Sequence, residues 1–92
     1  MILVRPELDG DLHLVLAGGG ATMIAEAPSP GCTGGAMPIL RREMARARRA
    51  VRVCRRAIVT GVVFWDFPHG QIGVAPNAIA LHPVLGFRCL RR

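Results

Sequence analysis

Hydrophobic and polar residues alternate through the first third of the chain with a period of two, which is typical of β-strands. Residues 12–17 (LHLVLA) alternate in this way, and residues 22–26 (TMIAE) follow after three glycines at 18–20 that favour a tight reversal. A short apolar run at residues 1–5 precedes them. We therefore expect a strand and then a β-hairpin, before prolines and glycines in residues 28–35 stop strand pairing.

The period becomes helical from Pro38 to about Arg56, where apolar residues recur at i, i+4, i+7, i+11 and i+14. We expect an amphipathic helix whose C-terminal end is open, because residues 51–53 (VRV) also suit the start of a strand. The apolar stripe consists of Leu40, Met44, Ala47, Val51 and Cys54. The opposite half of the helix carries eight arginines: Arg41, Arg42, Arg46, Arg48, Arg49, Arg52, Arg55 and Arg56.

Two further strands are predicted after the helix. Residues 57–67 are rich in β-branched and aromatic side chains, and residues 78–88 resume the apolar pattern. The predicted order is therefore β-β-β-α-β-β, which is mainly β with one α-helix. This order is that of a small OB-like five-stranded barrel, and the length suits a single OB-like domain spanning residues 1–92.

The charge of the chain favours an anionic partner. Twelve Lys and Arg residues against six acidic ones give a formal net charge of +6, and every one of the twelve is an arginine. A basic surface attracts polyanions such as nucleic acid. A phosphate-binding loop of the Walker type is excluded because the chain has no lysine. Residues 67–87 are uncharged but contain three prolines and three glycines, so we expect no membrane span.

The three cysteines, Cys32, Cys54 and Cys89, match no CxxC-type spacing. We therefore expect neither a structural zinc site nor a cofactor. Two interpretations of the cysteines are open: Cys54 and Cys89 are simple buried side chains, or two of the three cysteines form a disulfide.

Three segments together resemble a family of small, largely uncharacterised bacterial proteins, many of them exported. The segments are DGDLHLVL, TMIAEAPSPGC and VTGVVFWDFPHGQIGVAPNAIALHPVL, within residues 9–34 and 59–85. The corresponding family motifs are D-G-D-x-H-L-V-L, M-I-A-E-x-P-x-P-x-C and T-G-V-x-F-x-D-x-x-H-G-Q-x-G-V-A-P-N-x-I-E-L-H-P-V-L. The resemblance implies an OB-like fold and candidate positions, but no established activity.

Two departures from the family pattern affect the expectations. Ala80 stands where the family has a glutamate, so one carboxylate beside His82 is lost. The chain also begins near the first strand without the leader that relatives often have. With no signal peptide in the chain as given, we expect a cytoplasmic protein, or an exported one if the N-terminus is truncated.

The candidate polar site follows from the last motif. Asp66, His69 and His82 suit metal binding or acid-base chemistry, but the same residues also suit a capped turn and a backbone hydrogen bond. Gln71 and Asn77 lie in the glycine-containing loop between the two strands, where ligand contacts are common. The tripeptide Asp9-Gly10-Asp11 with His13 resembles the acidic turn of some OB-fold nucleases, but we favour a hairpin turn.

We expect a non-enzymatic binding domain for an anionic partner, with single-stranded nucleic acid as the leading candidate. The eight helix arginines would contact phosphates, and Trp65 would offer a surface on which a base can stack. The alternatives are a metal-dependent, nuclease-like hydrolase that uses Asp66, His69 and His82, and a structural or interaction domain.

Overall fold

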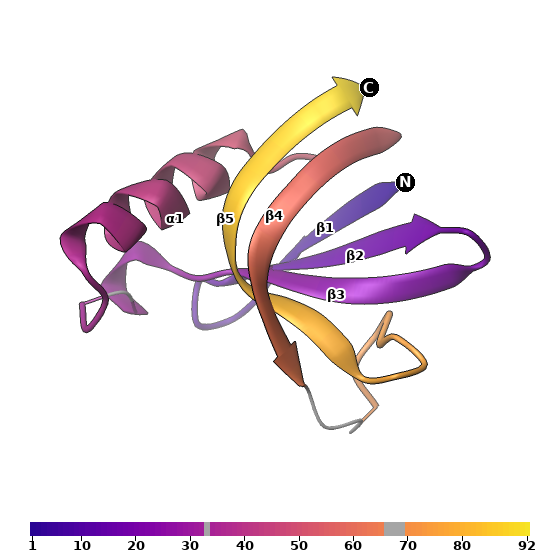
Figure 1. Cartoon of the computed structure of the whole chain (residues 1–92), viewed down its shortest axis with the longest axis horizontal. Helices are drawn as coiled ribbons and strands as arrows, with labels where there is room; N and C mark the ends of the chain where they lie inside the picture. Colours follow the sequence, from indigo (N-terminus) through magenta and orange to yellow (C-terminus); the bar gives the residue numbers. More distant parts are fainter. Residues whose placement is uncertain (33, 66–69) are drawn as a thin grey trace.

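The computed structural model describes residues 1–32, 34–65 and 70–92 and shows a mainly β protein with one α-helix (Figure 1). The predicted order of elements is confirmed. The elements are β1 (Ile2–Pro6), β2 (Leu12–Gly18), β3 (Ala21–Ala27), a short 3-10 turn (Pro30–Cys32), α1 (Pro38–Ala50), β4 (Arg56–Trp65) and β5 (Ile79–Arg91).

The five strands form one mixed sheet in the order β1-β2-β3-β5-β4. Neighbouring strands are antiparallel except β3 and β5, which pair in parallel at Ala25 and Leu81. Within the described residues, β1 and β4 share no ladder. Only one isolated antiparallel bridge joins Ile2 to Cys54, with N–H···O distances of 2.6 and 3.2 Å. The sheet is therefore not closed, and the predicted closed barrel is not confirmed.

Helix α1 begins at Pro38 as expected but ends six residues before Arg56. Val51 already has extended backbone angles (φ −60°, ψ 130°), and β4 starts at Arg56. The expected place of Cys54 on the helix stripe is therefore wrong. Cys54 is buried, but it lies in an extended segment that is held by Ile2. This long-range pairing, together with the β-branched Val51 and Val53, outweighs a helical spacing that would otherwise continue.

The core lies between the sheet and the helix. Leu14, Ala25 and Val84 are fully buried on β2, β3 and β5 and belong to this core. Met44 and Ala47 are the buried residues of α1, which lies alongside β5 (Figure 1). Each fully buried Leu, Ile or Val contributes about 1.5–3 kcal/mol relative to an exposed position.

A disulfide joins Cys54, just before β4, to Cys89 near the end of β5, with a Cα–Cα distance of 6.1 Å. The disulfide interpretation of the cysteines is therefore the one that the structure supports. The bond closes a loop of 35 residues, and cross-links of this kind typically stabilise a domain by about 2–4 kcal/mol. Cys54 thus anchors the end of the sheet through a covalent bond and a backbone bridge.

The loop between β4 and β5 lies against β2. Gly73 has φ +87°, and a Cβ atom added there would lie only 2.6 Å from a methyl group of Val15. Further along, the Ala78 amide donates to the Ala75 carbonyl (2.9 Å), and the Ile79 amide donates to Asn77 Oδ1 (3.1 Å). The expected turn at Asn77 is therefore confirmed, and residues 73–79 of the loop are placed by these contacts.

We expect Gly73→Ala to lower the free energy of unfolding by about 2–4 kcal/mol, because it combines a left-handed backbone with a steric clash. Gly20→Ala is the matched control, since Gly20 has φ +80° but nothing within 4 Å of the added Cβ. The control should cost only about 1–2 kcal/mol. Urea unfolding of both variants checks this. Equal losses would show that Val15 does not restrict the loop.

Candidate functional site

Three polar side chains meet on one face of the β2–β3 hairpin. His13 on β2 pairs directly with Glu26 on β3, so both side chains point to the same face of the sheet. Glu7 belongs to the loop that joins β1 to β2 and turns back over this face. One ligand atom from each of the three residues lies within 4.8 Å of the others.

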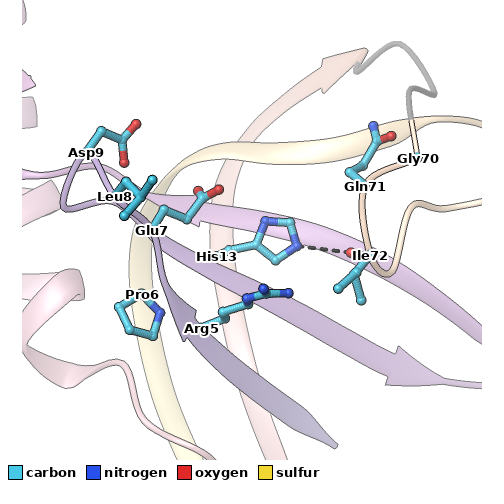
Figure 2. A pocket seen from close by; sticks show the side chains of 9 residues that line it. All are labelled: Arg5, Pro6, Glu7, Leu8, Asp9, His13, Gly70, Gln71 and Ile72. Atoms are coloured by element: carbon cyan, nitrogen blue, oxygen red, sulfur yellow. Dashed lines mark hydrogen bonds between the residues drawn. The ribbon is translucent and has the colours of Figure 1, made fainter.

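His13 is held by a hydrogen bond at each ring nitrogen. Its side chain is buried, and Nε2 lies 3.0 Å from the carbonyl oxygen of Ile72 (Figure 2). A carbonyl only accepts, so Nε2 carries the hydrogen and donates it. Nδ1 lies 3.1 Å from Glu26 Oε1, and therefore one proton is shared between His13 and Glu26.

Glu26 has a buried carboxylate oxygen, Oε2, that lacks a hydrogen bond within the described residues. Burial raises the pKa of Glu26 to about 7, the neighbouring Glu7 carboxyl adds to the rise, and His13 opposes it. The side chain therefore holds a proton at pH values where an exposed glutamate is ionised.

The cluster borders a cavity of about 330 Å³ between the hairpin and the strands that follow the helix. Asp9 and Asp11 add two further carboxylates to its wall, and Phe64, Ala80 and His82 form the side contributed by β4 and β5. A larger adjoining cavity of about 840 Å³ shares Glu7, Asp9, His13 and Gln71 with it, and Arg5 and Ile72 also line this larger cavity (Figure 2).

The expected turn at Asp9-Gly10-Asp11 is confirmed. Gly10 has φ +89°, and Asp9 Oδ1 accepts a hydrogen bond from the Asp11 amide (3.0 Å). Asp11 Oδ1 in turn accepts from the Ser29 amide (2.7 Å), which ties the turn to the segment after β3. The turn is thus structural, and it also brings its two carboxylates to the cavity.

The structure describes three of the five predicted polar site residues. His82 is exposed, lines the cavity and makes an edge-on ring contact with Phe64 at 5.7 Å. Gln71 lines both cavities. The Asn77 side chain instead accepts the hydrogen bond from the Ile79 amide that stabilises the turn. Asp66 and His69 lie outside the described residues. The expected proximity of Asp66 to His82 therefore also falls outside them.

Sequence reasoning missed the cluster of Glu7, His13 and Glu26. One signal for it was present: a two-residue turn at Gly19-Gly20 fixes the hairpin register and places position 13 opposite position 26. Glu7 had no such signal, because its position depends on the path of a loop.

The predicted arginine surface divides into three groups. Arg41, Arg42, Arg46 and Arg49 are exposed on α1, and Arg52, Arg55 and Arg56 are exposed beyond its end. Arg48 forms the third group, because its guanidinium group donates hydrogen bonds to backbone carbonyls of other segments. Its Nη1 donates to the Ala27 carbonyl (3.1 Å) and its Nη2 to the Gly10 carbonyl (2.7 Å).

The four exposed helix arginines make no ion pair with a carboxylate of the described residues. The single ion pair among those residues joins His13 to Glu26.

Trp65 and Phe64 near the end of β4 are 56% and 49% exposed, unusually high values for aromatic side chains. No helix of the described chain has the length and apolar character needed to cross a membrane.

Comparisons with protein-family models, with curated proteins and with solved structures found no match. The resemblance of the sequence motifs to an uncharacterised bacterial family therefore stays an expectation.

The raised pKa of Glu26 predicts a pH-dependent stability. A carboxyl whose pKa is higher in the folded state stabilises the fold below its unfolded pKa, near 4.5, and this contribution is lost as the pH rises through about 7. We expect wild type to lose about 1–2 kcal/mol from this source between pH 5 and 8, a value reduced for solvent screening.

Glu26→Gln should remove most of this loss, because the amide stays neutral at every pH. Urea unfolding at pH 5, 6, 7 and 8 measures it. Glu43→Gln on α1 is the charge-matched control and should keep the wild-type pH dependence. If Glu26→Gln kept it as well, another group would be responsible.

Proposed function

We propose that this protein is a small OB-like binding domain for an anionic partner, with single-stranded nucleic acid as the leading candidate. One observation carries the proposal: Arg41, Arg42, Arg46 and Arg49 are exposed on one helix without a carboxylate partner in the described chain. Guanidinium groups in this state are available to phosphates, and each phosphate contact adds a salt-dependent increment of affinity.

The topology supports the OB-like part of the proposal. The strand order β1-β2-β3-β5-β4, the parallel contact of β3 with β5, and a helix between β3 and β4 fit a five-stranded Greek-key barrel that is partly open. The bridge from Ile2 to Cys54 is the contact through which β1 would approach β4. Such barrels often bind oligonucleotides.

Exposed aromatic side chains add support for a single-stranded partner. Trp65 and Phe64 expose large parts of their rings, and stacking of a base on an aromatic ring contributes about 1–3 kcal/mol in single-strand binding proteins. The carboxylates of Glu7, Asp9 and Asp11 would repel phosphates from the cavity beside them. We therefore assign the backbone contacts to the helix and not to the cavity.

Fluorescence anisotropy with a labelled oligo-dT of about 15 nucleotides tests this, over about 50 to 200 mM salt. Four phosphate contacts correspond to a slope of about −2.8 in log K against log[salt]. We expect the variant with Arg41, Arg42, Arg46 and Arg49 all changed to Gln to lose at least tenfold in affinity and most of that slope.

The matched control changes Arg5, Arg88, Arg91 and Arg92 to Gln, which are exposed arginines outside the helix. Both variants lose the same charge, so the control should keep most of the affinity if the helix surface is the binding surface. Equal losses would mean that only net charge matters. No binding by wild type at 50 mM salt would contradict the proposal.

The alternative of a nuclease-like hydrolase is favoured by one observation, the position of His82 on the wall of the carboxylate-lined cavity. Its two other expected residues, Asp66 and His69, lie outside the described part of the chain. Gel analysis of the same oligonucleotide after incubation with divalent cations separates the two functions, since a binding domain leaves the strand intact.

A further inference from the structure

We propose that Glu7, His13 and Glu26 form a binding site for one divalent transition-metal ion, with Zn²⁺ as the best-matched ion. This inference does not rest on the nucleic-acid proposal. It assigns residues other than the Asp66, His69 and His82 expected from the sequence, and it concerns the opposite kind of ligand, a cation.

The spacing of the ligand atoms is close to what an ion requires. Carboxylate oxygens and imidazole nitrogens bind Zn²⁺ at about 2.0–2.2 Å, so two ligand atoms of one tetrahedral ion lie about 3.3–3.6 Å apart. The ligand atoms of Glu7, His13 and Glu26 all lie within 4.8 Å of one another. Glu7 is exposed in a loop, and a side-chain movement of about 1–1.5 Å would bring its carboxylate into range.

His13 is oriented as metal-binding histidines usually are. Its Nε2–H donates to the Ile72 carbonyl (Figure 2), and this fixes the ring with Nδ1 toward Glu26 Oε1. A metal-binding histidine almost always donates its other ring N–H to a carbonyl or carboxylate, which fixes both its tautomer and its orientation. Only the proton shared with Glu26 has to leave before Nδ1 can bind an ion.

A second, independent observation is the unsatisfied oxygen of Glu26. Oε2 is buried without a hydrogen-bond partner in the described chain, a state that costs about 1–3 kcal/mol or more for a charged group. Glu7 places another carboxyl beside it. A bound cation would supply the missing partner of Oε2 and would remove the repulsion between the two carboxylates.

The ligand set selects the class of ion. One nitrogen and two carboxylates suit Zn²⁺, whereas Mg²⁺ and Ca²⁺ prefer six or more oxygen ligands. Three protein ligands leave one tetrahedral position open toward the cavity of about 330 Å³. The exposed Arg5 opposes a cation from the adjoining cavity, but Asp9 and Asp11 contribute two negative charges nearby.

Isothermal titration of the untagged, EDTA-treated protein with ZnCl₂ at pH 7.5 tests the site. Alkylation of free thiol beforehand prevents Cys32 from binding the ion. We expect one Zn²⁺ per chain in wild type and at least a tenfold weaker binding in both Glu26→Gln and Glu7→Gln. The glutamine amide at position 26 can donate to His13 Nδ1 as a protonated glutamate does, so this variant should keep its fold, which circular dichroism checks.

Glu43→Gln, which removes a helix carboxylate of equal charge, should bind Zn²⁺ like wild type. Weak binding in the two cluster variants with unchanged binding in this control supports the assignment. No stoichiometric binding by wild type at about 100 μM Zn²⁺ would overturn it. Wild-type affinity in Glu26→Gln, or equal weakening in Glu43→Gln, would overturn it as well.

Discussion

Leu14 of β2 and Ala25 of β3 face each other across the hairpin and are both fully buried, and His13 and Glu26 form the next pair. Because side chains alternate along a strand, this register sends the first pair into the core and the second pair to the opposite face. A slip of one residue in either strand would turn its side chains to the other face and place the Glu26 carboxyl or the His13 imidazole among Val84 and Phe87. The hydrophobic core and the polar cluster therefore depend on the same strand pairing.

The charges of the chain are separated in space in a way that its net charge does not reveal. Four of the six acidic residues, Glu7, Asp9, Asp11 and Glu26, line a single cavity. The exposed arginines of α1 lie on a different element. A formal charge of +6 thus describes neither surface: the exposed arginines of α1 form one, and the carboxylates of the cavity form the other.

Much of the fold could be predicted from the sequence because it is local. The alternation in residues 12–17, the glycines at 18–20 and the proline at the start of α1 each determine structure within a few residues. The end of α1 could not be predicted from local sequence. Cys54 lies in an extended segment because it bonds to Ile2 through the backbone and to Cys89 through the disulfide, and both residues are distant in sequence. For the candidate site, the motif predicted His82 and Gln71, and both line the cavity. Glu7 was missed because only the folded loop brings it to His13, and Asp66 and His69 lie outside the described residues.

Arg48 connects the helix to both sides of the polar cluster. Its guanidinium bonds the carbonyl of Gly10, in the loop that carries Glu7, Asp9 and Asp11, and the carbonyl of Ala27, the residue after Glu26. Hydrogen bonds from a charged donor are worth about 1.5–3 kcal/mol, enough to join neighbouring elements into one cooperative unit. A single side chain of α1 therefore holds the turn after β1 and the end of β3 at a fixed place beside the helix.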